Sequence, residues 1–207
     1  MKPKQLFHKA FAGAVLLASC CLWSCNSDPE PVIAGSEAKT YYKQIALGVE
    51  FGTGSGVVHK WETNLKIFVT GEPADYLLLE LDKIIEEINA LSGSGTKLER
   101  VSDEADANFE IFFGSGNDYA AIEPNAASYV AANWGLTWIY WNTSSVIYQG
   151  SMYVDIYRAT DMSAQKHLLR EELTQSLGLL NDSYDYANSI FTRPGLRPPS
   201  MQTSTGK

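Results

Sequence analysis

The strongest constraint on the fold of this chain is an amphipathic segment at residues 74–91. Its apolar residues recur at steps of three and four, the period of an α-helix with one buried face, and acidic side chains occupy the opposite face. A Ser-Gly-Ser-Gly stretch at residues 92–95 ends this pattern. Such a helix needs a second layer over its apolar face, so we expect it to pack on a sheet. The apolar positions are Leu77, Leu78, Leu81, Ile84, Ile85, Ile88 and Leu91.

Segments with the alternation of β-strands lie before and after this helix. Residues 60–70 carry apolar side chains at mostly alternating positions, and Gly71 and Pro73 end that pattern. A second helix is expected at about residues 164–177, with Gly178 at its C-terminus. This order predicts an α+β fold, a mixed sheet with two main helices on one face. The other strands are expected at residues 97–101, 108–113, 136–141 and 146–157, the last two joined as a hairpin across residues 142–145.

The N-terminus has the three parts of a bacterial lipoprotein signal peptide. A positive region contains Lys2, Lys4 and Lys9, an apolar run covers residues 10–18, and small residues and cysteines follow. The apolar run is too short to cross a membrane as a helix, which takes about 20 apolar residues. A transmembrane anchor or a buried helix is the alternative interpretation of this segment.

Two cysteines of this leader follow residues that resemble a lipobox. The residues before Cys20 suit a signal peptidase better than those before Cys25, where Trp23 is bulky. The polar, acidic residues 26–30 suit the start of a mature chain and resemble the surface-export signals of some bacterial lipoproteins. Cleavage before Cys25 also leaves no other thiol in the mature chain. We therefore expect lipidation of Cys25 and an extracytoplasmic protein anchored in the cell envelope, at the outer membrane.

The charge balance limits the classes of partner. The chain has 16 basic and 24 acidic residues and a formal net charge of −8. Removal of residues 1–24 takes away three lysines and no acidic residue, which leaves 13 basic residues against 24 acidic ones and a charge of −11. A nucleic-acid partner is not expected on such a balance. The membrane would be reached through the lipid, not through a basic patch.

The sequence divides into four parts. Residues 1–24 are the signal peptide, and residues 25–45 are the lipidated cysteine and a flexible polar tether. Residues 46–191 form the folded domain, whose stability has to come from packing because it contains no cysteine. Residues 192–207 form an irregular tail without acidic residues, which is consistent with truncation or a frame shift after about residue 191.

The second expected helix carries a polar stripe beside an apolar stripe of leucines. His167, Glu171 and Gln175 are spaced by four residues, so helical geometry brings an imidazole, a carboxylate and an amide together on one face. Glu172 lies next to them in the sequence. This set is the most informative group of polar residues in the chain.

The stripe resembles the metal-binding helix of zincin metallopeptidases. Zincins carry H-E-x-x-H, in which two histidines bind zinc and the glutamate activates water, and metzincins extend it to H-E-x-x-H-x-x-G-x-x-H. Laid on this chain, the pattern keeps Glu172 and Gly178, while Glu171, Gln175 and Asn181 stand at the three ligand positions. The form E-E-L-T-Q-x-L-G-L-x-N-D resembles a bacterial family, domain-of-unknown-function family 2927, whose members look like zincin relatives.

The resemblance covers about residues 60–190 and implies a zincin-like fold with a candidate site on this helix. Glu172 would be the general base for a metal-bound water, with Glu171, Gln175 and Asn181 around the metal. His167 could supply a nitrogen ligand. Amide side chains are weak ligands, so zinc would be held poorly. The domain is then either non-catalytic or a peptidase with an atypical metal site.

Calcium and purely structural roles are the alternatives for these side chains. Calcium accepts oxygen ligands but takes six to eight of them, and Asp182 and Asp185 could add to the set. Adjacent glutamates usually belong to a solvated helix face, and an amide after a helix often bonds the following loop. A single histidine is more often a partly buried, hydrogen-bonded residue than a ligand.

Two kinds of binding function compete. The strand at residues 149–155 precedes the helix, and the zincin resemblance implies there the antiparallel edge that lines up extended peptides, a general mode of peptide capture. The alternative is an aromatic surface that binds glycans or peptides. Alternation along a strand allows at most half of these aromatic residues to be exposed. A structural or assembly role has no motif for or against it. The aromatic residues concerned are Trp134, Trp138, Tyr140, Trp141, Tyr148 and Tyr153.

Overall fold

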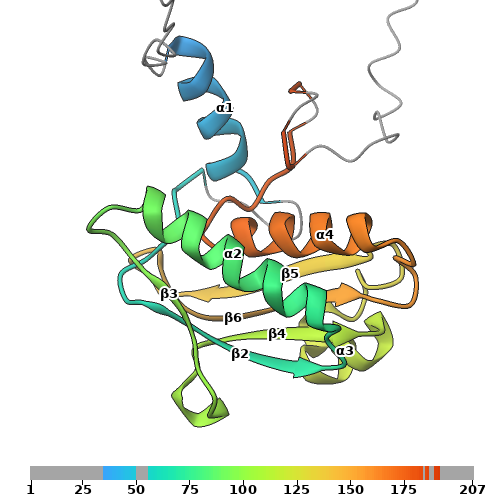
Figure 1. The fold of residues 1–207 in the computed structure, drawn as a ribbon. Helices are drawn as coiled ribbons and strands as arrows, with labels where there is room; N and C mark the ends of the chain where they lie inside the picture. The colour runs from blue at the N-terminus through green and yellow to red at the C-terminus, as the bar shows by residue number, and fades with distance from the viewer. Residues whose placement is uncertain (1–34, 50–55, 184, 187–188, 192–207) are drawn as a thin grey trace, which may run out of the picture. The chain divides into compact units, whose positions relative to one another are not determined.

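The computed structural model describes residues 35–49, 56–183, 185–186 and 189–191 (Figure 1). The two predicted helices correspond to α2 and α4, and a strand lies in each predicted strand segment, so the α+β fold is confirmed. No helix of the described ranges is long and apolar enough to span a bilayer. In chain order the elements are α1 (Ser36–Ala46), β1 (Lys60–Trp61), β2 (Leu65–Gly71), α2 (Asp75–Leu91), β3 (Leu98–Arg100), η1 (Glu104–Asp106), β4 (Phe109–Gly114), α3 (Gly116–Ile122), η2 (Pro124–Ala126), β5 (Gly135–Trp141), β6 (Val146–Asp155) and α4 (Met162–Gln175).

The strands form one sheet that is parallel except at one edge. Its order is β1-β6-β4-β2-β3, with every neighbouring pair parallel, and β5 pairs antiparallel with the other side of β6 (Figure 1). The predicted hairpin is therefore confirmed. The prediction that residues 149–155 form the antiparallel edge is wrong, because β6 lies between β5 and β4. The edge beside α4 is β5.

The turn of this hairpin is held by one side chain. Asn142 Oδ1 accepts hydrogen bonds from the backbone N–H groups of Ser144 at 2.9 Å and Val146 at 3.1 Å. Ser145 adopts a φ of +61°, and its N–H donates to Asn142 O at 2.9 Å. An asparagine that replaces missing backbone partners in this way fixes the register of β5 on β6.

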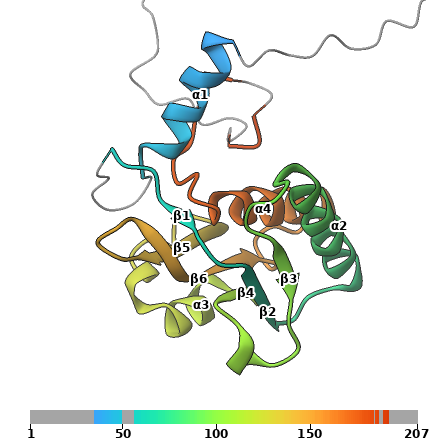
Figure 2. The same ribbon diagram turned by 90° about the vertical axis from the view of Figure 1, so that its left-hand side faces the viewer.

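Helices cover both faces of the sheet, which differs from the predicted arrangement on one face. α2 and α4 lie on one side and α3 on the other (Figure 2). The larger core joins α2 and α4 to the sheet through residues such as Leu81, Ile111 and Leu169, which are fully buried. A smaller core under α3 contains Tyr119 and Tyr153, whose rings stack at 4.6 Å. Burial of these apolar surfaces is the main stabilising term, at about 25 cal/mol per Å².

Helix α1 occupies residues that the sequence placed mostly in a flexible tether. Its C-terminal end is bound by the segment after α4: Asn181 Nδ2 donates to Gln44 O at 3.0 Å, and Asn181 N donates to Ile45 O at 3.2 Å. Ile45 and Ala46 are buried. The predicted signal peptide with Cys25, and the predicted tail 192–207, lie outside the described residues.

Helix α4 is fixed at both ends, which positions the polar stripe. Asp161 caps its start, since its Oδ1 accepts from Ser163 N at 2.6 Å. At its end, Gly178 has a φ of +102°, as expected for the residue after a helix. A Cβ at Gly178 would lie 2.0 Å from His59 O, so only glycine fits here. The end of α4 is therefore tied to the segment before β1.

Candidate functional site

The polar stripe of α4 is buried. Glu171 and Glu172 are each 4% exposed and Gln175 is 6% exposed. Two adjacent carboxylates on a solvated helix face would be much more exposed, so that interpretation does not hold for this pair. Burial of charged groups is costly unless other groups compensate, which marks this part of α4 as specialised.

Glu172 lies against β5. A Cβ on Gly135 would come within 2.8 Å of Glu172 Oε1 and 3.0 Å of its Cγ, so the glutamate side chain occupies the space that the glycine leaves. The backbone carbonyl of Glu172 accepts a hydrogen bond from Thr137 Oγ1 at 2.7 Å. These two contacts hold α4 close to β5 at the position of the predicted general base.

His167 and Glu171 meet on the next turn. His167 Nε2 lies 3.5 Å from Glu171 Oε2, at the spacing expected for residues four apart on a helix. Burial lowers the pKa of the His167 imidazole below its usual value, so the neutral ring is favoured at neutral pH. The pair is a contact within α4, between a half-buried ring and a buried carboxylate.

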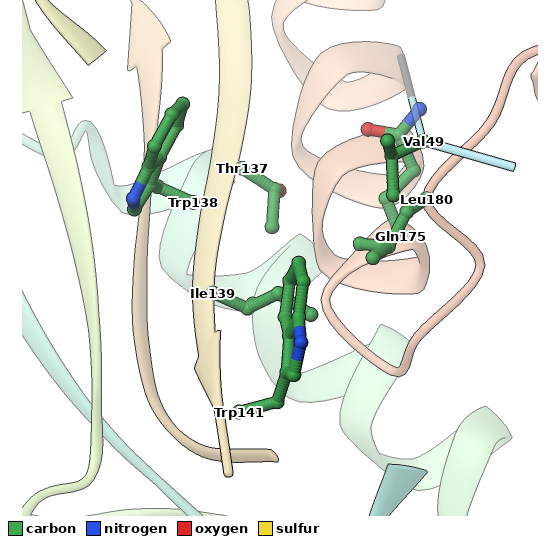
Figure 3. A pocket seen from close by; sticks show the side chains of 7 residues that line it. All are labelled: Val49, Thr137, Trp138, Ile139, Trp141, Gln175 and Leu180. Atoms are coloured by element: carbon green, nitrogen blue, oxygen red, sulfur yellow. The ribbon is translucent and has the colours of Figure 1, made fainter. Parts of the chain in front are cut away.

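Gln175 has its side-chain amide oriented by Asp182. Gln175 Nε2 donates to Asp182 Oδ1 at 3.1 Å, and both side chains are buried. Figure 3 shows the amide oxygen on the side of β5 and the nitrogen on the side away from it. Within the described part of the chain no hydrogen bond reaches Gln175 Oε1, so this oxygen remains an acceptor facing β5.

Asn181 and Asp185 face α1 instead of the stripe. Asn181 Nδ2 bonds the carbonyl of Gln44, and its side chain packs on Gly48, where a Cβ would come within 2.8 Å of its Cγ. Asp185 Oδ2 accepts from Gln44 Nε2 at 2.8 Å. Of the predicted ligand set, the structure brings together His167 with Glu171, and places Asn181 in a different contact.

The donor set does not fit zinc or calcium. Structural and catalytic zinc sites use three or four converging nitrogen, sulfur or carboxylate ligands, and calcium takes six to eight oxygens. Over residues 35–49 and 56–183 and the short described segments that follow, no three His, Cys, Asp or Glu side chains are grouped so that they could hold a metal ion. The amide nitrogens of Gln175 and Asn181 donate to Asp182 Oδ1 and Gln44 O, respectively, so these two side chains are oriented by different neighbours.

A pocket of about 70 Å³ lies between β5 and the end of α4 (Figure 3). In the figure Thr137 and Ile139 point toward α4, whereas the ring of Trp138 lies on the other side of the strand. The pocket therefore lies beside β5 on the side of α4. The lining residues are Val49, Thr137, Trp138, Ile139, Trp141, Gln175 and Leu180.

The outer edge of β5 carries backbone groups that β6 does not use. Gly150 N on β6 donates to Asn108 O at 3.1 Å, toward β4, so its pair with Ile139 has no hydrogen bond between β5 and β6. Such pairs alternate with hydrogen-bonded ones in an antiparallel ladder. The N–H and C=O groups of Thr137 and Ile139 therefore point away from β6. Among the described strands β5 pairs with β6 alone.

His59 supports the pocket from behind Trp141. The two rings stack with centroids 4.1 Å apart and an interplanar angle of 29°. His59 is 4% exposed, and within the described residues its Nδ1 has no hydrogen-bond partner. Burial lowers the pKa of this imidazole. The neutral His59 ring therefore serves as a stacking partner of Trp141.

The aromatic residues do not form one exposed surface. Tyr153 is fully buried, and the ring of Trp138 lies 5.9 Å from that of Tyr129 on the α3 side. Tyr140 donates to Glu123 Oε2 at 2.7 Å on that side too, beside a second cavity of about 190 Å³. Trp141 belongs to the pocket near α4. The set is divided between two faces and a core.

Several residues that shape this site were not found from the sequence. Gly135, Thr137 and His59 carry no motif, and only the pairing of β5 with β6 and the packing of α4 bring them together. The sequence suggests Asp182 only as a further calcium ligand. Its hydrogen bond to Gln175, seven residues earlier, depends on the path of the chain after Gly178.

Comparison with known proteins identifies a family whose description states no function. A family model described as "Protein of unknown function (DUF2927)" matches residues 36–193. No curated protein matches the chain. The matched region begins at the first residue of α1 and includes every described helix and strand. Helix α1 therefore belongs to the region that the family model matches.

Proposed function

The chain belongs to domain-of-unknown-function family 2927, and on this premise we propose that its domain captures an extended peptide along the outer edge of β5 without hydrolysing it. The observation that carries the proposal is the pair of outward N–H and C=O groups on Thr137 and Ile139, next to a pocket that Gln175 lines. A peptide added as a further strand would satisfy these groups. Its alternate side chains would face the pocket.

A relationship to zinc metallopeptidases supports the same use of this edge. The zincin resemblance placed the substrate strand at residues 149–155. The antiparallel edge strand beside the helix with the Glu-Glu-x-x-Gln motif is β5 instead, and we assign the same role to β5. The residues at the metal positions have other partners, so we propose a degenerate metallopeptidase-like domain that retains peptide binding and has lost zinc. Glu172, which packs against Gly135, then has a structural role.

The setting of this activity is the cell envelope. The leader with Cys25 and the acidic mature chain support export and a lipid anchor, at the outer membrane. A peptide-binding domain held at a membrane by one lipid would meet extracytoplasmic peptides or unfolded segments of other envelope proteins. A glycan ligand is less well supported, because the aromatic side chains are divided between different faces.

The proposal is tested by blocking one outward N–H. Thr137→Pro removes that donor and leaves the ladder to β6 intact, because Thr137 N points away from β6; proline is tolerated on edge strands for this reason. Thr137→Val is the matched control, which removes only the hydroxyl that bonds Glu172 O. The probe is an acetylated and amidated heptapeptide of alternating Thr and Val, with Tyr at its centre.

We expect the full-length chain in detergent and its Thr137→Val variant to bind this peptide, and Thr137→Pro to lose binding while keeping its circular dichroism spectrum. Mass spectrometry should find the peptide intact after incubation with and without added zinc. Equal binding by all three proteins would contradict edge capture. Cleavage that Glu172→Gln abolishes would support a peptidase with an atypical site instead.

A further inference from the structure

The pocket beside β5 combines apolar walls with polar side chains of Thr137 and Gln175, and the Thr137 hydroxyl already donates to Glu172 O. Val49, Ile139, Leu180 and Trp141 provide apolar surface, and the Trp141 ring is supported from behind by His59. The polar atom that faces β5 is Gln175 Oε1. A side chain that fills this space therefore meets apolar surface along its length and a hydrogen-bond acceptor at one point.

The acceptor is fixed in direction. Gln175 could otherwise rotate its amide and present either the oxygen or the nitrogen, but Asp182 Oδ1 can only be approached by the nitrogen. The amide nitrogen donates to a carboxylate, and such chains of hydrogen bonds polarise one another, which strengthens the oxygen as an acceptor. The pocket therefore selects a donor and disfavours a carboxylate or a carbonyl.

We infer that this pocket receives a tyrosine side chain of the captured peptide, with its hydroxyl donating to Gln175 Oε1; this inference rests on the proposed function. The ring would pack on Trp141, in an offset or edge contact of the kind that aromatic pairs prefer. Phenylalanine would contact the same walls but has no donor for Gln175 Oε1, and an acceptor that a bound ring shields from water without pairing is unfavourable. A lysine would have to lose most of the hydration of its ammonium group.

The inference is tested with three peptides on the unmodified full-length chain. The central residue of the heptapeptide is Tyr, Phe or O-methyltyrosine, and binding is followed by the fluorescence of the protein's tryptophans. O-methyltyrosine keeps the ring and the oxygen but has no donor. A neutral hydrogen bond contributes about 0.5–1.5 kcal/mol, which is about a 2- to 12-fold change in Kd. We expect the Tyr peptide to bind tighter than both others by about this factor.

A substitution at Gln175 tests whether this residue causes the preference for the Tyr peptide over the Phe peptide. Gln175→Met has a similar length and no acceptor, so it should bind the Tyr and Phe peptides with equal affinity. Because this change also removes a partner of Asp182, Leu180→Ala serves as a second variant that keeps the acceptor. Leu180→Ala should raise the Kd of the Tyr peptide and of the Phe peptide by similar factors. The ratio of the two Kd values should therefore stay the same.

The outcomes separate the two proposals. Binding of all three peptides with the same Kd would overturn the tyrosine pocket and leave edge capture standing. Tighter binding of the Phe or O-methyltyrosine peptide than of the Tyr peptide would also overturn it. Failure of every heptapeptide to bind would refute the proposed function, and the tyrosine pocket with it.

Discussion

Gln175 and Asp182 are joined by a hydrogen bond of 3.1 Å between the amide nitrogen and a carboxylate oxygen, and both side chains are buried at the end of α4. In the resemblance to zincins, Gln175 takes the position of the second histidine. In this chain the position is used to orient an amide, with the oxygen toward β5 (Figure 3). The site therefore places a hydrogen-bond acceptor beside the outer edge of β5, which pairs with β6 alone among the described strands.

Zinc should neither bind nor stabilise the protein. A ligand that binds the native state at 100 times its Kd adds about 2.7 kcal/mol to the free energy of unfolding, which raises Tm by several degrees. We expect the Tm of the metal-free chain to stay within about 1 °C when zinc or calcium is added, with no stoichiometric metal in elemental analysis. A saturable rise in Tm with one bound metal per chain would show that the replaced ligands still form a site.

Gly178→Ala should destabilise the protein far more than a similar change elsewhere. The new Cβ would lie 2.0 Å from His59 O, at a φ of +102°. Gly93 also has a positive φ, of +56°, but a Cβ there meets no atom within 4 Å. We expect Gly93→Ala to cost about 1 kcal/mol for the backbone conformation alone, and Gly178→Ala about 3 kcal/mol or more. Urea denaturation measures the free energy of unfolding of both variants. Equal losses would mean that the contact between the new Cβ and His59 O does not destabilise the protein.

His59 should make the protein less stable in mild acid. Burial lowers its pKa in the folded state, so between about pH 6.5 and the lower folded pKa the unfolded chain binds more protons than the native one. The free energy of unfolding therefore falls as the pH drops below about 6.5, with a slope of at most about 1.4 kcal/mol per pH unit from this group.

The control for this effect is His59→Phe, which keeps a flat ring beside Trp141 and cannot titrate. Its loss of stability between about pH 7 and about pH 5 should be smaller than that of the unmodified chain. His167, whose pKa is also lowered by burial, contributes to both proteins alike. If the two pH profiles coincide, His59 is not held in its neutral form by burial.

Lipidation should depend on Cys25. Metabolic labelling with a fatty acid, followed by mass spectrometry of the N-terminal peptide, distinguishes the two candidate sites. We expect Cys25→Ser to abolish labelling and leave an uncleaved leader, and Cys20→Ser to be labelled normally. The opposite pattern would move the lipid to Cys20, whose preceding residues are the better match to a lipobox.

The elements that the sequence predicted best are those with a clear period. Residues 74–91 repeat apolar side chains at helical steps and form α2, and the strands around them alternate as strands do. Helix α1 was missed because its sequence is polar on average, and contacts with Asn181, far along the chain, hold its end. Helix α3 was missed because it is a short helix, held by the packing of Tyr119 on β6.

The candidate site was located by its motif, but its chemistry depends on distant contacts. The spacing of Glu171, Glu172 and Gln175 points to α4, yet the sequence gives no sign that the two adjacent carboxylates are buried. The direction of the Gln175 amide follows from Asp182, and the free edge of β5 follows from its pairing with β6. Neither the contact of Gln175 with Asp182 nor the pairing of β5 with β6 produces a periodic pattern or a fixed spacing that can be recognised in the sequence.

Amide hydrogen exchange along β5 tests the central claim most directly. The N–H groups of Thr137 and Ile139 point outward, whereas those of Trp138 and Tyr140 lie at hydrogen-bonded pairs with β6. On addition of the tyrosine heptapeptide, exchange measured by NMR should slow at Thr137 and Ile139 and stay unchanged at Trp138 and Tyr140. Unchanged exchange at all four positions, with the peptide shown to be bound, would contradict capture at this edge.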